Sequence, residues 1–208
     1  MIGSKLGAAA VALAFIGAPA AAGTITFNDL TTTNYYDAYQ TVTEGGLLFT
    51  NSFGLSNDFI VWGASNAYNA DQGGATLVND WSGTTTTVTR VGGGKFDLAS
   101  IDLADVYNNG SGGTVRFNFY GDTAGTFYVD LDQLVGLQTF TFNMTGLIAF
   151  DYTPLTTQGP WIQVDNLVTE LNAAPAPEPA SWAMMLGGFG LIGGALRTAR
   201  RKTQLSFG

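Results

Sequence analysis

Short segments of alternating apolar and polar residues cover most of the chain between positions 24 and 168. The clearest segment follows Gly112-Gly113, where Val115, Phe117 and Phe119 share one parity and polar side chains occupy the other. A period of two puts successive side chains on opposite faces of a β-strand, so each segment predicts a strand with one buried face. Comparable segments span residues 24–27, 47–50, 58–62, 75–79, 84–91, 96–103, 127–131, 139–144, 148–152 and 161–168.

The segments are separated by Gly, Asn, Asp and Ser, and none carries a helical period of useful length. About ten short strands with turn residues between them indicate an all-β fold, and we expect a jelly-roll-like antiparallel β-sandwich. Within residues 96–103 the apolar parity changes in the middle, so we expect a β-bulge near Ala99-Ser100 that returns both halves to one face. Residues 31–43 show no clear period and are predicted to form a loop.

The N-terminus has the three parts of a secretory signal peptide, which we assign to a signal helix within residues 1–22. Lys5 supplies the positive charge, residues 6–16 are apolar, and small residues precede Gly23. We therefore expect export through the Sec machinery and cleavage between Ala22 and Gly23. The apolar run is short and no stop-transfer charges follow it, which argues against a first transmembrane helix.

The C-terminus combines a proline-rich linker, an uncharged apolar segment and a basic cluster. Prolines favour extended geometry, so residues 173–179 are predicted to form a linker after a β-sandwich ectodomain of residues 23–172. The next seventeen residues are uncharged and rich in glycine, and at ~1.5 Å per residue they reach about 25 Å of a ~30 Å hydrocarbon core. We expect residues 180–208 to form a transmembrane helix with a cytoplasmic basic stop and a tail. The basic residues are Arg197, Arg200, Arg201 and Lys202.

Three motifs stand in order within this C-terminal region. They are Pro177-Glu178-Pro179, Ser181-Trp182-Ala183-Met184-Met185 and Gly188-Phe189-Gly190. Together with the basic cluster, they closely resemble the PEP-CTERM sorting signal of Gram-negative bacteria, a module also known as an ice-binding protein C-terminal domain. The resemblance covers residues 177–202. It implies that an exosortase, a membrane transpeptidase-like enzyme, processes the chain at the inner membrane before the protein reaches the cell surface or extracellular matrix of an organism that makes exopolysaccharide.

The body carries a second, looser resemblance. Residues 96–104, 115–119, 136–142 and 162–166 look like parts of the jelly-roll bodies of other secreted PEP-CTERM proteins, which are similar in shape to carbohydrate-binding modules. Similarity of fold does not transmit a ligand. The single threonine run at 84–87 is not a repeated array, so ice binding is not expected.

The chain contains no cysteine and no histidine. It therefore has no disulfide framework, no imidazole base for a Ser-His-Asp arrangement and no imidazole ligand for zinc. Residues 23–172 carry only Arg90, Lys95 and Arg116 as basic residues, against fifteen acidic ones. Such a surface repels phosphate groups, so we exclude a nucleic-acid partner. No carboxylate pair is distinguished for glycoside hydrolysis, and a non-catalytic protein is expected.

Calcium is a candidate cofactor, because oxygen-rich acidic surfaces suit hard cations. Asp130 and Asp132 are separated by one residue and would share a face of their predicted strand. Asp165, beside Asn166, lies near the predicted end of the sandwich, and Asp71 lies in a polar loop. Solvated surface carboxylates and Asx turns are the alternative for each of them, and no EF-hand spacing is present.

A sugar ligand would use exposed aromatic rings flanked by amide and carboxylate groups. Trp81 lies in a predicted turn and is the best single candidate. Trp161 has the parity opposite to that of the apolar residues after it, and Tyr128 and Tyr120 have outward parity in their strands. Core packing is the alternative, because tryptophan is more often largely buried than exposed as a platform.

These observations predict an exported, non-catalytic protein of the cell envelope or extracellular matrix, associated with exopolysaccharide in a biofilm. The alternative is a carbohydrate-binding jelly-roll module with structural calcium. A secreted glycan-active enzyme is the third alternative.

Overall fold

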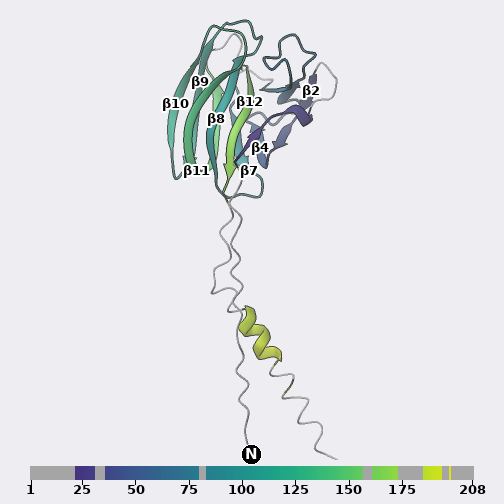
Figure 1. Cartoon of the computed structure of the whole chain (residues 1–208), viewed down its shortest axis with the longest axis vertical. Helices are drawn as coiled ribbons and strands as arrows, with labels where there is room; N and C mark the ends of the chain where they lie inside the picture. Colours follow the sequence, from purple (N-terminus) through teal and green to yellow (C-terminus); the bar gives the residue numbers. More distant parts are fainter. Residues whose placement is uncertain are drawn as a thin grey trace, which may run out of the picture. The chain divides into compact units, whose positions relative to one another are not determined.

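The computed structural model describes residues 22–30, 36–79, 83–156, 161–172, 185–193 and 197. The chain divides into two compact units, and the larger one is Pro19–Asn172. The smaller unit combines Met1–Ala18 with Ala173–Gly208. The strands drawn in Figure 1 belong to the larger unit.

The larger unit is built from β-strands and one short 3-10 helix, η1 (Asn28–Leu30). β-branched and aromatic residues are frequent in the strands, where they pack well on a pleated surface. The strands are β1 (Ala22–Ile25), β2 (Tyr36–Tyr39), β3 (Thr41–Glu44), β4 (Leu47–Asn51), β5 (Phe59–Trp62), β6 (Thr76–Asn79), β7 (Thr86–Arg90), β8 (Phe96–Asp105), β9 (Gly113–Gly121), β10 (Gly125–Leu131), β11 (Gln138–Pro154) and β12 (Ile162–Leu171).

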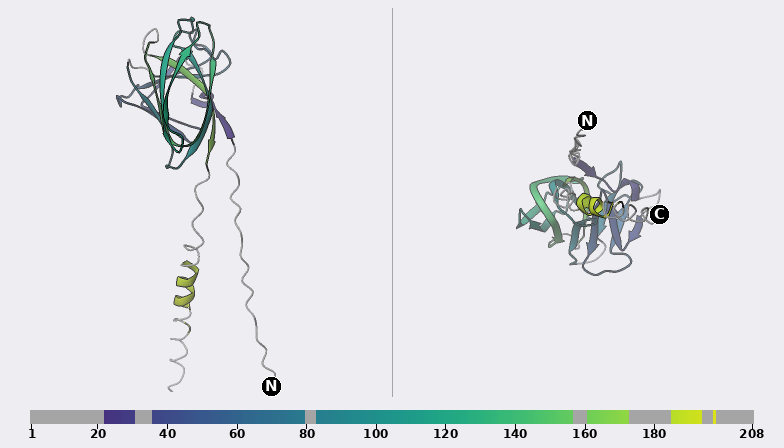
Figure 2. Two further views of the ribbon diagram at one scale, coloured as in Figure 1. Left: turned by 90° about the vertical axis from the view of Figure 1, so that its left-hand side faces the viewer. Right: turned by 90° about the horizontal axis from the view of Figure 1, so that it is seen from below.

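Hydrogen bonds join all twelve strands into one continuous sheet, which the long strand β11 divides into two halves. The first half of β11 pairs with β8, and its second half pairs with both β7 and β9. We call the half that runs β2-β5-β6-β12-β8-β11, with β1 also on β12, the first sheet, and the half that runs β3-β4-β7-β11-β9-β10 the second sheet. Every pairing among the described strands is antiparallel. Figure 2 shows these strands curving around a common interior, which confirms the predicted all-β antiparallel sandwich.

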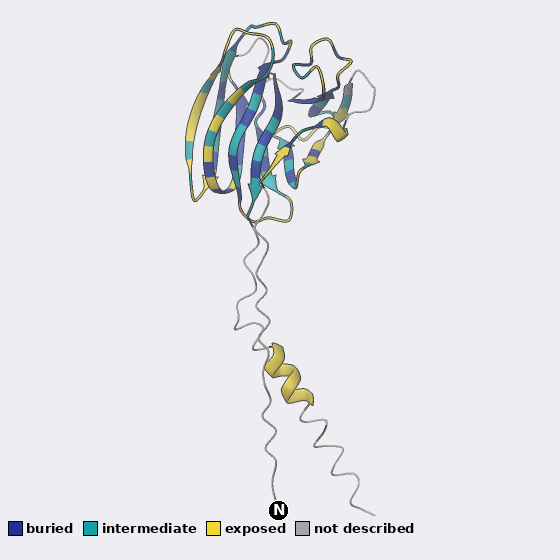
Figure 3. Ribbon diagram, in the orientation of Figure 1, coloured by how far each residue is buried: buried dark blue, intermediate teal, exposed yellow. Residues whose placement is uncertain are grey.

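The core of the unit is formed by the inward faces of the two sheets. Phe117 and Phe119 of β9 are buried, as their alternation predicts, and so are Phe150 and Tyr152 of β11. The ring centroids of Phe119 and Phe150 lie 5.9 Å apart. Burial of one such side chain contributes about 2–3 kcal/mol. Figure 3 shows the resulting alternation of buried and less buried positions along the strands.

The predicted bulge in β8 is present at Ala99. Its neighbours Leu98 and Ser100 pair with the adjacent residues Thr169 and Val168 of β12, so Ala99 is the extra residue. A bulge shifts the parity of the strand by one position. The apolar residues on both sides of Ala99 are therefore buried against the same core.

Two local predictions are wrong. Strict alternation places Ile148 inward with Phe150, but Ile148 is 55% exposed. The register of β11 against β9 shifts between Leu147 and Ala149, and this shift turns Ile148 outward. Part of the predicted loop at 31–43 forms β2 and β3, which are stabilised by pairing with β5 and β4 rather than by a pattern of their own. Residues 31–35 lie outside the described residues.

In the smaller unit, residues 185–193 and Arg197 are helical and exposed. The part of the chain that the structure describes contains no helix with the length and apolar character needed to cross a membrane. Several predicted segments lie outside that part. They are residues 1–21 of the predicted signal peptide, the linker of residues 173–179, motif residues 177–184, and the basic residues Arg200, Arg201 and Lys202. The predicted domain limits and the predicted transmembrane helix stay predictions.

Candidate functional site

Polar and aromatic side chains gather on the solvent side of the second sheet. On β9, Arg116, Asn118 and Tyr120 have the parity opposite to that of the buried phenylalanines. In the register of the β9–β10 pair, Thr126 lies opposite Asn118 and Tyr128 lies opposite Arg116. We call this surface the outer face, and it is defined by Arg116, Asn118, Tyr120, Thr126, Tyr128, Asp151 and Thr153.

One row of hydrogen bonds crosses the outer face from β10 to β11. Thr126 Oγ1 donates to Asn118 Oδ1 at 2.8 Å, and Asn118 Nδ2 donates to Asp151 Oδ1 at 2.8 Å. The Tyr120 hydroxyl donates to the other oxygen of Asp151 at 2.6 Å. Since Asp151 is only 8% exposed and both of its oxygens accept hydrogen bonds, the row has a fixed geometry.

A second row runs beside the first. Tyr128, which is 63% exposed, lies opposite Arg116 in the strand register. Arg116 Nη2 donates to Thr153 Oγ1 at 3.1 Å, and Thr153 Oγ1 lies 2.8 Å from Thr85 Oγ1. Arg116 Nε is buried and has no hydrogen-bond partner among the described residues. The guanidinium group is therefore held against the sheet with part of its donor capacity unused.

The outer face is chemically mixed. The hydrogen bond to Asp151 raises the pKa of Tyr120, burial and the Asp151 charge raise it further, and Arg116 acts in the opposite direction. Tyr120 therefore stays protonated at neutral pH and keeps its donor. Aromatic rings, an amide, a guanidinium and a carboxylate together offer apolar contact, donors and acceptors, which is the combination that a hydroxyl-rich ligand requires.

Of the three aromatic residues that the sequence nominates first for sugar binding, the structure describes Tyr128 and Trp161 and places them on different parts of the body. Tyr128 lies on the outer face. Trp161 is half-buried and packs with Trp62 and the cluster around it, and its Nε1 is buried without a hydrogen-bond partner in the described part of the chain. Trp81 lies outside the described residues.

Asp130, Asp132 and Asp165, three of the four aspartates nominated for calcium, are not brought together. Asp130, on the exposed edge strand β10, accepts a 2.7 Å hydrogen bond from Thr114 Oγ1. Asp132 follows β10 and accepts a bond from the backbone N–H of Leu134 at 3.2 Å. Asp165 lies in β12, a strand of the first sheet. Among the described residues, no group of three His, Cys, Asp or Glu side chains is arranged to hold a metal ion.

Asp165 is the unusual carboxylate of the three. It is completely buried, and neither of its oxygens has a hydrogen-bond partner among the described residues. Burial, together with the nearby carboxylates of Asp71 and Asp102, raises the pKa of Asp165 to about 7. The backbone N–H groups of Asn166 and Phe27 approach the carboxylate and lower the pKa, although neither meets hydrogen-bond geometry.

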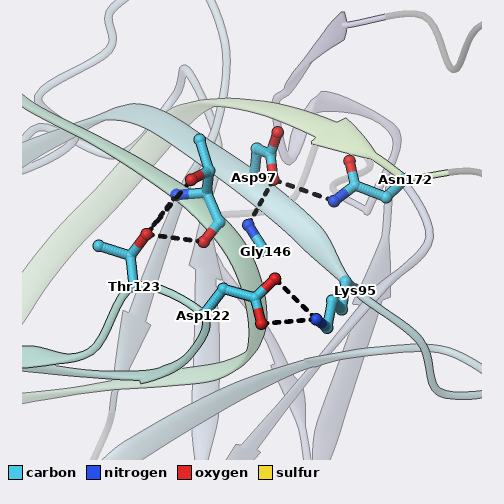
Figure 4. Close-up of polar contacts among 7 residues, drawn as sticks. Lys95, Asp97, Asp122, Thr123, Gly146 and Asn172 are labelled. Atoms are coloured by element: carbon cyan, nitrogen blue, oxygen red, sulfur yellow. Dashed lines mark hydrogen bonds and ion pairs between the residues drawn. The ribbon is translucent and has the colours of Figure 1, made fainter.

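A separate polar cluster lies where β12 ends (Figure 4). Lys95 Nζ forms an exposed ion pair with Asp122 at 2.6 Å. Asp97 Oδ1 accepts bonds from the backbone N–H of Gly146 at 2.7 Å and from Asn172 Nδ2 at 3.0 Å. Asp97 thus links β8 to β11 and to the residue after β12, and the Lys95–Asp122 ion pair is a separate contact beside it.

Sequence reasoning found Tyr120 and Tyr128 but missed Asn118, Asp151 and Arg116 as members of one surface. The outward parity of these residues was readable in their own segments. Their convergence depends on the pairing of β9 with β11, and the Asn118–Asp151 bond spans 33 residues of sequence. A sequence pattern with a period of two carries no information about which strands pair.

Comparison with known proteins identifies a motif at the C-terminus and solved structures with low similarity to the body. The PEP-CTERM protein-sorting motif matches residues 175–202. No curated protein matches the chain. Among solved structures, a family 32 carbohydrate-binding module of AlyQ in complex with 4,5-unsaturated mannuronic acid is 16% identical, with a TM-score of 0.37 over 66% of this chain and 99% of that one.

Two further solved structures are similar at comparable levels. The K2 cleaved adhesin domain of Lys-gingipain is 13% identical, with a TM-score of 0.43 over 72% of this chain and 99% of that chain. A family 11 carbohydrate-binding module from Clostridium thermocellum, in complex with a β-1,3-1,4-mixed-linked tetrasaccharide, is 12% identical, with a TM-score of 0.32 over 74% and 98%. The chain thus joins a β-sandwich body to a PEP-CTERM protein-sorting motif, which marks it for exosortase sorting to the outside of the cell.

Proposed function

We propose that this chain is an exported, non-catalytic protein of the cell surface or extracellular matrix, and that its outer face binds a polysaccharide. The sorting motif supports a destination outside the cell, where extracellular polysaccharide is available as a partner. The β-sandwich is the part of the chain that presents a defined surface there.

The observation that carries this proposal is the position of Tyr128. Its ring is 63% exposed on a regular strand, beside the polar rows that contain Asn118 and Arg116. A flat ring can contact the apolar face of a sugar, while neighbouring amide and guanidinium groups bond to its hydroxyls. Because strands hold these groups at regular spacings, the face suits a linear chain of sugars rather than one isolated residue.

The charge of the body restricts the class of polysaccharide that it can bind. Residues 23–172 carry three basic and fifteen acidic residues. On the outer face Asp151 is matched by Arg116, and Asp130, the next outward residue of β10 after Tyr128, adds a further negative charge beside it. A strongly anionic polymer would be repelled by this surface. We therefore expect a neutral or weakly charged polysaccharide.

A binding assay with the full chain, purified in mild detergent, tests the proposal. Affinity electrophoresis through gels that contain neutral polysaccharides should show retardation of the wild-type protein. Tyr128→Ala should weaken binding about five- to thirtyfold, because loss of one stacked ring removes about 1–2 kcal/mol. Tyr107→Ala is the matched control, since Tyr107 is 38% exposed but contacts Tyr68 rather than the outer face.

Two results would contradict carbohydrate binding at this face. One is the absence of binding to every polysaccharide tested. The other is equal loss of binding in the Tyr128 and Tyr107 variants, which would place the ligand elsewhere or indicate a general disturbance of the fold. The first result would favour a structural matrix protein without a glycan ligand.

We also propose the route of delivery. The signal peptide at 1–22 would direct the chain to the Sec machinery, and residues 180–208 would hold it in the inner membrane with the basic cluster in the cytoplasm until an exosortase acts. Replacement of Pro177-Glu178-Pro179 by alanines should leave the protein in the membrane fraction instead of at the surface. Normal surface delivery of that variant would contradict the route.

A further inference from the structure

The buried carboxylate of Asp165 lies on the side of β12 where the polar loop of residues 63–75 is bonded to Gln163. Asp165 and Gln163 alternate with the core residues Ile162 and Val164, so they lie on the opposite side of β12. Gln163 is satisfied, because its Oε1 accepts bonds from the N–H of Ala70 and from a threonine hydroxyl in β6. Asp165 is equally buried, but its oxygens have no partner among the described residues. A native structure rarely leaves such a group without a ligand.

No described basic side chain of the larger unit compensates Asp165. Lys95 is paired with Asp122, Arg90 binds the backbone carbonyls of Lys95 and Asn172, and Arg116 lies on the outer face. The charges close enough to influence Asp165 are the carboxylates of Asp71 and Asp102, which have the same sign. Like charges repel one another in a poorly solvated site unless a cation joins them.

Two further oxygens converge beside Gly74, in the loop that covers β12. A Cβ atom at Gly74 would lie 2.2 Å from Asp71 Oδ2 and 2.3 Å from Asn28 Oδ1, so both oxygens are aimed at one point. Asn28 Oδ1 also accepts the backbone N–H of Ala75 at 2.7 Å, and Asp71 Oδ1 accepts that of Gly73 at 3.0 Å. These bonds hold the two side chains in place and leave lone pairs unused.

We propose that Asp165, Asp71 and Asn28 Oδ1 bind a calcium ion that fastens the polar loop and the segment after β1 to β12. Calcium accepts six to eight oxygen ligands in a flexible geometry, and carboxylate and amide oxygens are among its usual ligands. Two carboxylates match its charge. Backbone carbonyls and water supply the other positions. Asp102 contributes charge from outside, because its Oδ2 is bonded to Asn166 Nδ2 at 2.9 Å.

Thermal unfolding of the full chain, stripped with chelator and then dialysed, tests the site. Addition of about 1 mM CaCl2 should raise the unfolding midpoint by about 5 °C or more, because an ion that binds only the folded state stabilises that state. The same concentration of MgCl2 should raise it much less, because magnesium demands a more rigid octahedral site. Isothermal titration with CaCl2 should show one bound ion per chain.

Matched variants locate the ion. Asp165→Asn should abolish the calcium response, whereas Asp130→Asn, on the exposed edge strand, should keep it. Gly74→Ala changes no charge but places a methyl group between the two converging oxygens, so it should weaken calcium binding at least about tenfold. Gly73→Ala is its control, because a Cβ there would meet only Asp71 Oδ1 at an ordinary 3.6 Å.

The result that supports the site is a calcium-specific rise that Asp165→Asn and Gly74→Ala remove and that Asp130→Asn and Gly73→Ala retain. The assignment would be overturned by an unchanged midpoint in CaCl2, by an equal rise in MgCl2, or by a full calcium response in Asp165→Asn. The Tyr128→Ala variant should respond to calcium as the wild type does, so this result is independent of carbohydrate binding.

Discussion

The hydroxyl of Tyr120 donates a 2.6 Å hydrogen bond to Oδ2 of Asp151 and so links β9 to β11 across 31 residues of sequence. Asp151 accepts a second bond from Asn118 on its other oxygen. The almost buried carboxylate thereby holds two side chains of β9 in fixed positions on the outer face. The positions of Asn118 and Tyr120 on this surface therefore depend on a single residue of the neighbouring strand.

Removal of the Tyr120 hydroxyl tests this link. Tyr120→Phe keeps the ring but removes the donor, so the free energy of unfolding should fall by about 1 kcal/mol. Tyr128→Phe, at the more exposed position, should change it by less than about 0.5 kcal/mol. Urea unfolding followed by fluorescence measures both. Equal effects of the two substitutions would contradict a specific role for the Tyr120–Asp151 bond.

Two phenylalanines on neighbouring strands should differ sharply in their contribution to stability. Phe117 of β9 is fully buried, whereas Phe127 of β10 is 43% exposed. Phe117→Ala should cost about 3–5 kcal/mol, because it leaves a cavity among closely packed rings. Phe127→Ala should cost less than half as much. Chemical denaturation of the two variants gives the comparison, and similar losses would mean that β10 belongs more firmly to the core than its exposure indicates.

The raised pKa of Asp165 predicts a pH dependence in calcium-free buffer. The folded group keeps its proton up to a pKa of about 7, whereas the unfolded group loses it near 3.8. Its contribution to stability is therefore fully present below pH 3.8 and is lost as the pH rises through 7. Between about pH 5 and pH 8 this loss should amount to about 2.5 kcal/mol, and Asp165→Asn should lack it. If the wild type and Asp165→Asn showed the same pH dependence of stability, Asp165 would not be its cause.

The two sets of contacts in Figure 4, the hydrogen bonds to Asp97 and the Lys95–Asp122 ion pair, should contribute unequally to stability. Asp97→Ala removes an acceptor shared by Gly146 and Asn172, and should lower the free energy of unfolding by about 1.5–3 kcal/mol. Lys95→Met breaks an exposed ion pair and should cost less than about 1 kcal/mol, with a smaller effect at high salt. Urea unfolding at two salt concentrations distinguishes them. A larger loss from Lys95→Met would reverse this ranking.

The sequence pattern predicted those features that depend on neighbouring residues. The alternation around Phe117 placed three side chains in the core, and the parity change in residues 96–103 predicted the bulge at Ala99. Both follow from the two-residue period of a strand and the need to bury one face. The bulge that turns Ile148 outward was not predicted, because Ile148, Phe150 and Tyr152 follow one regular alternation in the sequence.

Features that depend on distant residues were not predictable in this way. The sequence of β2 shows no alternation of apolar and polar residues, and the segment forms a strand through its pairing with β5. Asp165 was readable as a calcium candidate from its type and place near the end of the sandwich. The participation of Asn28 and Asp71 depends on how the loop folds over β12, and no local pattern encodes that contact. The link between Asn118 and Asp151 has the same origin.

The first and last strands of the sandwich are partners, since Ala22 to Ile25 of β1 pair with Glu170 to Leu167 of β12. A chain that emerges from a pore N-terminus first presents β1 long before its partner exists. The pairing of β1 with β12 can form only after nearly the whole body has emerged. Until then β1 lacks its partner strand, while the strands between them can already pair with one another. On the proposed export route, the pairing of β1 with β12 would therefore be among the last to form.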